Sequence, residues 1–148
     1  MDRAEVTADP AKVAIATGIL GTATETGVRR HVGELFGGNT VVLTEQRDPE
    51  HVPLKPTFDA SEAGAGPLGK LVQEIGKPVQ SRRYGSSGVP FGPVRRKMEA
   101  FLRQHRVTVI VAEFGHLGAN LAPVGAGLGI PVFVYFRGFD ASKRLREA

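Results

Sequence analysis

The stretch "VTVIVAEFGHLGANLAPVGAGLGIPVFVYF", residues 107–136, indicates the fold by itself. Two runs within it, Val107–Phe114 and Pro131–Phe136, are rich in β-branched residues and almost continuously apolar. Such runs are typical of strands that are buried on both faces of a parallel sheet. The residues between them, 118–131, are apolar and small enough for a helix packed on that sheet, although the glycines and Pro123 weaken the helix prediction. The stretch therefore predicts a right-handed βαβ unit.

The same pattern occurs nearer the N-terminus. Lys12–Leu20 and Asn39–Glu45 have the composition of buried strands, and residues 25–38 between them have apolar side chains at helical spacing. A further helix is predicted over residues 93–105. Strands that alternate with helices predict an α/β fold, here a Rossmann-like open parallel sheet with helices on both faces. We expect one domain over residues 12–148, preceded by a polar tail of residues 1–11.

Residues 47–92 lack this pattern. They are rich in proline, glycine and alanine, and only Leu68–Ile75 favours a short helix or strand. The segment is predicted to be a loop-rich excursion over the sheet edge or the ligand side.

Composition excludes several classes of site. The chain of 148 residues has 41% hydrophobic and 23% charged residues, as ordinary soluble domains do, and neither a leader peptide nor a membrane span is visible, so we expect a cytoplasmic protein. It has no cysteine, and its four histidines lack metal-binding spacing, so no metal site is predicted. The net charge of +4 permits anionic ligands, but aromatic residues do not alternate with the basic clusters, which argues against nucleic acid.

Each predicted strand ends in a polar or glycine-rich loop, and the carboxyl ends of parallel strands form the ligand crevice of such folds. The third loop carries Glu113 and His116, a carboxylate and an imidazole that could perform acid–base work on a hydroxyl group. Alternatively, His116 only caps or hydrogen-bonds the turn that follows.

The first and last loops offer groups for an acceptor or a phosphate. The first combines small residues with a helix N-terminus, although it has neither the GxGxxG spacing nor a Walker sequence. In the last, the arginine would hold an anion and the aspartate would cap a final helix. The candidate residues are Gly18, Gly21, Thr24, Glu25, Thr26, Arg137, Gly138 and Asp140.

Two segments resemble a known family. "TATETGVRRHVGEL", residues 22–35, and "VIVAEFGHLGANLAPVGAGLGIPVFVYFRGFDAS", residues 109–142, resemble the N-terminal domain of bacterial GT-B glycosyltransferases with a subfamily 4-like N-terminal domain. In the second segment, the FG pair, the next glycine, the GIP before the strand and the GFDAS ending follow in family order. Arg137 stands where the family has histidine, His116 where it has proline and Gly27 where it has phenylalanine.

The resemblance implies transfer of a sugar from a nucleotide-diphosphate donor to a glycan or lipid-linked acceptor, with no bound metal or cofactor. Such enzymes, common in capsule, exopolysaccharide and lipopolysaccharide synthesis, have two Rossmann-like domains, of which the N-terminal one mainly holds the acceptor. The chain would then be the acceptor-side domain without its C-terminal donor domain, and inactive alone. The basic residues beside the apolar stripe of residues 93–105 also suggest peripheral contact with an anionic membrane, at its inner face.

Two other functions stay open. The chain could be a stand-alone Rossmann-like module that binds a nucleotide or a phosphorylated metabolite. It could also be a non-catalytic subunit that completes a separate donor domain.

Overall fold

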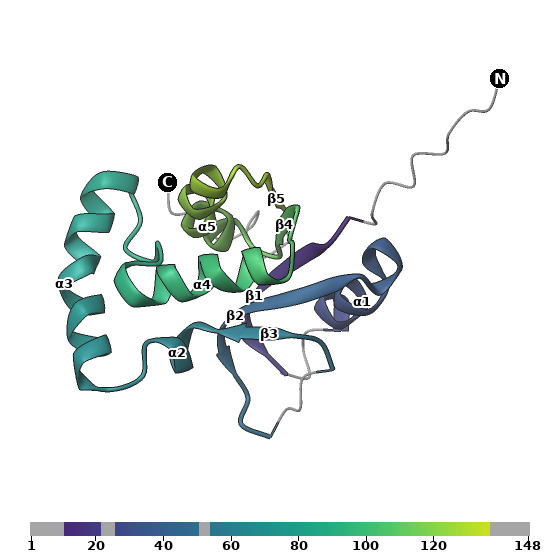
Figure 1. Cartoon of the computed structure of the whole chain (residues 1–148), viewed down its shortest axis with the longest axis horizontal. Helices are drawn as coiled ribbons and strands as arrows, with labels where there is room; N and C mark the ends of the chain where they lie inside the picture. Colours follow the sequence, from purple (N-terminus) through teal and green to yellow (C-terminus); the bar gives the residue numbers. More distant parts are fainter. Residues whose placement is uncertain (1–10, 22–25, 51–53, 137–148) are drawn as a thin grey trace, which may run out of the picture.

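The structure, a computed structural model, describes residues 11–21, 26–50 and 54–136, and its centre is a five-stranded parallel sheet (Figure 1). The strands lie in the order β3-β2-β1-β4-β5, so the chain moves outward from β1 in one direction and then in the other. Their bounds are β1 Val13–Leu20, β2 Thr40–Arg47, β3 Thr57–Asp59, β4 Val109–Ala112 and β5 Val132–Val134. The predicted α/β class, a Rossmann-like open sheet, is confirmed.

Helices cover the two faces of the sheet unequally. On one face, Val28 of α1 packs against Val13 and Ile15, and the 3-10 turn η1 follows α1. On the other face, α4 and α5 close the larger core around Ala14 and Leu43, and α3 stands at the outer end of the molecule (Figure 1). The bounds are α1 Thr26–Glu34, η1 Leu35–Gly38, α2 Ala60–Ala63, α3 Pro67–Tyr84, α4 Gly92–Gln104 and α5 Gly115–Leu128.

Helix α5 forms despite the glycines that weakened its prediction, because they let it approach β5 closely. A Cβ atom on Gly118 would lie 2.2 Å from Cγ2 of Val134, and one on Gly125 would lie 2.6 Å from the carbonyl oxygen of Ile130. Larger side chains at these two positions would push the helix off the sheet. The cost in helix propensity is therefore offset by close packing.

The prediction of a loop-rich excursion over residues 47–92 is wrong. The segment contains β3, α2 and the 18-residue helix α3. Asp59 caps α2 with its carboxylate, accepting hydrogen bonds from the backbone N–H groups of Ser61 (2.8 Å) and Glu62 (3.3 Å). Helix α3 starts at Pro67, which suits a first turn, and ends before Gly85, whose φ of 71° is left-handed. Its internal Pro78 hid the helix from the sequence pattern.

The basic residues beside the apolar stripe of α4 suggest peripheral contact with an anionic membrane, but the stripe itself belongs to the core. Val94, Met98 and Leu102 are buried against the sheet. Arg95 is held by Glu99 at 2.9 Å, and this hydrogen bond raises the pKa of the Arg95 guanidinium. The apolar stripe of α4 is therefore not available to a bilayer. Within the described ranges, no helix is both long and apolar enough to cross a membrane.

Candidate functional site

The strand order reverses between β1 and β4, which makes their carboxyl ends the switch point of the sheet. Ala16 of β1 pairs with Ala112 of β4, and the next backbone N–H, that of Glu113, donates to the carbonyl oxygen of Ala16 at 2.9 Å. Side chains that follow these two residues are therefore brought to one edge. In open parallel sheets this is where ligands bind.

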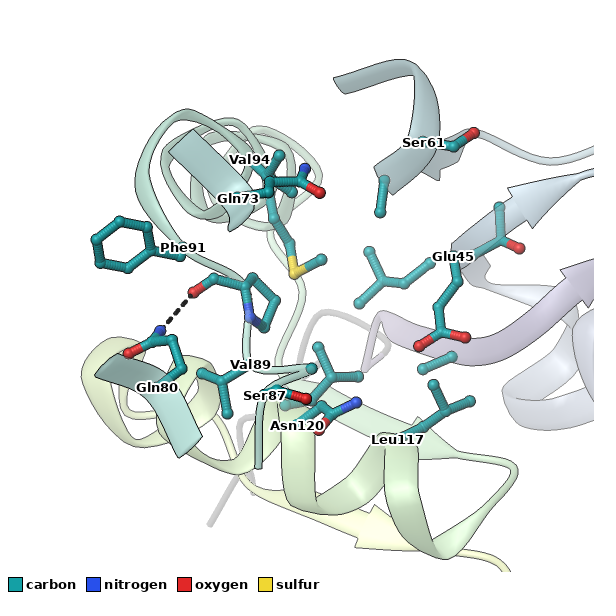
Figure 2. Close-up of a pocket in the computed structure, with 18 of the residues that line it drawn as sticks. Glu45, Ser61, Gln73, Gln80, Ser87, Val89, Phe91, Val94, Leu117 and Asn120 are labelled. Atoms are coloured by element: carbon teal, nitrogen blue, oxygen red, sulfur yellow. Dashed lines mark hydrogen bonds between the residues drawn. The ribbon is translucent and has the colours of Figure 1, made fainter. Parts of the chain in front are cut away.

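A cavity of about 340 Å³ opens at this edge, on the face covered by α4 and α5 (Figure 2). The middle of β1 and of β2 forms its floor, and α2, α3, α4, α5 and the loop of residues 85–91 surround it. Its size is that of a small-molecule pocket. Its polar lining residues are Thr17, Thr44, Glu45, Ser61, Gln73, Lys77, Gln80, Ser87 and Asn120.

The 85–91 loop is fixed to both of its neighbouring helices. The Gln80 amide of α3 donates to the carbonyl oxygen of Pro90 at 3.3 Å, as Figure 2 shows. Ser86 donates to the side-chain oxygen of Asn120 on α5 at 2.5 Å. A Cβ atom on Gly88 would lie 2.3 Å from the Asn120 amide nitrogen, so a larger residue here would displace the Asn120 side chain. The outer wall of the cavity is thus preorganised.

The polar groups of the cavity are mostly uncharged. Lys77 is the one cation among its described lining residues, and the ammonium group lies 2.5 Å from the carboxylate of Glu74. Glu45 adds a carboxylate, and the remaining polar lining consists of hydroxyl and amide groups. Apolar side chains such as Leu117 and Val89 complete the walls (Figure 2). This lining suits a ligand that carries hydroxyl groups and an apolar face, and it suits a phosphate poorly.

A buried carboxylate and an imidazole meet on the other face of the same edge. Glu113 is 0% exposed, and its Oε1 lies 2.5 Å from Nδ1 of His31 on α1, whose side chain is 24% exposed. The Tyr135 ring, just after β5, meets the His31 ring edge-on at 5.2 Å between centroids. When Nδ1 donates to the carboxylate, Nε2 is the nitrogen that accepts or exchanges a proton.

Sequence reasoning found Glu113 but missed His31. His116, its predicted companion, lies in the first turn of α5 and stacks on Phe114 with ring centroids 5.9 Å apart. A signal for His31 does exist in the sequence. It occupies the core-facing position of α1 three residues after Val28, where an imidazole needs a polar partner inside the protein.

The candidate phosphate loop is only partly within the described residues. Gly18 lies in β1, where its carbonyl oxygen accepts from the hydroxyl of Thr44 at 3.0 Å. Gly21 has a φ of 106°, which favours glycine, and Thr26 begins α1. Five further candidate residues lie outside the described residues, so the anion-binding and helix-capping roles predicted for the last loop stay predictions. They are Thr24, Glu25, Arg137, Gly138 and Asp140.

Among the residues that the structure describes, no three histidine, aspartate or glutamate side chains gather to hold a metal ion. Comparison of the chain with models of known protein families, with curated proteins and with solved structures finds no match.

Proposed function

We propose that this chain is the acceptor-side domain of a GT-B glycosyltransferase, which moves a sugar from a nucleotide-diphosphate donor to a glycan or lipid-linked acceptor. The observation that carries the proposal is the cavity at the switch point, with its hydroxyl, amide and single carboxylate groups. A sugar presents hydroxyl groups around an apolar ring face, which such a lining can hydrogen-bond and cover. The resemblance of residues 109–142 to this family supports the same function.

The charge of the cavity separates this proposal from a nucleotide-binding module. Phosphate sites are built from arginine or lysine side chains or from a helix N-terminus that faces the ligand. In the described cavity the only ammonium group, that of Lys77, is paired with Glu74, and Glu45 adds a negative charge. A neutral glycan is therefore favoured over a nucleotide or a phosphorylated metabolite.

In this proposal the donor nucleotide is held by a second domain that faces the same edge. Glu113 binds Nδ1 of His31, so Nε2 is the ring nitrogen of His31 that would take part in a proton transfer at this edge. The chain of 148 residues alone should bind an acceptor but not transfer sugar. A radiolabelled-sugar assay with common nucleotide sugars should stay at background, and clear turnover would contradict the half-enzyme assignment.

Titration calorimetry with a panel of neutral disaccharides tests the binding role. Glu45→Gln removes the carboxylate that lines the cavity, while Glu50→Gln makes the same change on an exposed loop away from it. We expect a disaccharide of the panel to bind, and Glu45→Gln to weaken that binding about tenfold, as expected when a charge-assisted hydrogen bond is lost. Glu50→Gln should bind as the parent does. Equal affinities of both variants, or no binding by any member of the panel, would argue against the proposal.

A further inference from the structure

Helix α3 is built with its aliphatic side chains facing outward. Leu68, Leu71, Ile75 and Val79 follow helical spacing and are 73%, 56%, 60% and 52% exposed, whereas the buried residues of this helix are Gly76 and Gln80. We call these four exposed residues the α3 stripe. A surface helix of a globular protein normally does the opposite and buries its aliphatic face.

The inner face of α3 explains this orientation. Gly76 allows Phe91 of the 85–91 loop to pack against the helix, because a Cβ atom there would lie 2.5 Å from the ring. Gln73 and Gln80, which share that side, line the cavity. The inner surface of α3 is thus occupied by the loop and the cavity, and the side chains of the α3 stripe stay exposed. Helix α3 itself stands at the outer end of the molecule (Figure 1).

Positive charge accompanies the α3 stripe. Arg82 and Arg83 in the last turn are three and four residues beyond Val79, so they are its neighbours at the C-terminal end of the stripe, and both are exposed. Arg82 and Arg83 supply the positive charge at the stripe, whereas Lys77 lines the cavity on the other side of the helix, where its ammonium group is paired with Glu74. The partner of this surface should therefore be apolar and negatively charged.

A second copy of the chain fits this surface poorly. In an antiparallel pair of α3 helices, Arg82 and Arg83 would lie beside the N-terminus of the partner helix, which is the positive end of its dipole and has no acidic residue in its first turn. In a parallel pair, the arginines of the two copies would face each other. Both arrangements place like charges together.

We infer that the α3 stripe lies on the surface of an anionic lipid bilayer, with its aliphatic residues in the headgroup boundary and Arg82 and Arg83 at the lipid phosphates. An amphipathic helix with an aliphatic face flanked by basic residues binds bilayers in this way. The inference goes beyond the proposed function and does not depend on it. It moves the predicted membrane contact from α4, whose stripe is buried, to α3.

Flotation of the chain with vesicles tests the inference. The probes are vesicles of phosphatidylcholine alone and of phosphatidylcholine mixed equally with phosphatidylglycerol. The chain should float with the mixed vesicles, less with phosphatidylcholine alone, and less again as salt is raised. The double variants Leu71→Ser with Ile75→Ser, and Arg82→Gln with Arg83→Gln, should each lower binding to mixed vesicles about tenfold.

Matched controls change the same residue types elsewhere. Leu54→Ser, at a position 95% exposed, and Arg103→Gln with Arg106→Gln should bind as the parent chain does. Circular dichroism melts verify that every variant is folded. Failure of the parent chain to float with any vesicle would overturn the inference, and so would α3 variants that bind like the controls. Sedimentation velocity that shows a dimer of the parent and monomers of the α3 variants would also overturn it, and would assign the stripe to a second copy.

Discussion

Helices α3 and α4 follow each other in the sequence and have similar compositions. Each has a proline in its first turn, an aliphatic stripe and exposed basic residues. Helix α4 buries Val94, Met98 and Leu102 in the main core. Helix α3 instead buries Gly76 and Gln80 and leaves Leu71 and Ile75 exposed. An amphipathic pattern therefore identifies the two faces of a helix, but what the rest of the fold presents decides which face is buried.

The largest expected effect concerns the buried stripe of α4. Leu102 is 0% exposed, so Leu102→Ala removes core contacts and leaves a cavity. We expect it to lower the free energy of unfolding by about 2–5 kcal/mol. Leu71→Ala makes the same change on α3, where the side chain is 56% exposed, and should alter stability by less than about 0.5 kcal/mol. Urea unfolding measures both, and similar losses would remove the contrast between the two helices.

A smaller effect is expected on the inner face of α3. Gly76→Val places a branched side chain where even a Cβ atom would lie 2.5 Å from the Phe91 ring. Overpacking of this kind costs about 1–3 kcal/mol. The substitution should also displace the 85–91 loop and weaken ligand binding in the cavity. The same change at Gly33, where a Cβ atom meets nothing within 4 Å, is the steric control. If Gly76→Val leaves both stability and binding unchanged, the inner face of α3 is not packed as described.

The smallest of these effects concerns the point where the chain enters α2. Asp59 accepts from the backbone N–H groups of Ser61 and Glu62, and its other oxygen accepts from the backbone N–H of Arg47 at 3.1 Å. Asp59→Ala should cost about 1 kcal/mol, as the loss of a helix cap does. Chemical denaturation of Asp59→Ala beside Asp59→Asn, which retains a capping oxygen, separates the cap from general disruption. Equal losses in the two variants would count against the capping role.

Four of the five strands (β1, β2, β4 and β5) and the helices α1, α4 and α5 could be predicted because local sequence patterns indicate their burial. Val13, Ile15 and Val111 belong to almost continuous apolar runs, which only a two-sided sheet accommodates. The sequence predicts only a short helix or strand over Leu68–Ile75 in place of the 18-residue helix α3, because its glycines and Pro78 are typical of a loop. The partner that requires Gly76, the Phe91 ring, lies 15 residues away and is not visible in the local pattern.

The candidate site also has one part that the sequence predicts and another that only the tertiary structure reveals. Glu113 follows a recognisable buried strand, and strand ends are the expected place for a site. Its partner His31 comes from a helix 82 residues earlier, so the pairing depends on tertiary structure. The cavity also depends on the 85–91 loop, which lies in the segment predicted to be irregular.

The central claim is that the cavity at the switch point holds a neutral glycan. Backbone amide NMR shifts of the chain, recorded with the disaccharide panel and separately with UDP-glucose, test it most directly. The account predicts that a disaccharide shifts the amides of Thr17, Glu45 and Asn120, which line the cavity, and that UDP-glucose shifts them less. Shifts of these amides with UDP-glucose, and with no disaccharide of the panel, would contradict the account and favour a nucleotide-binding module.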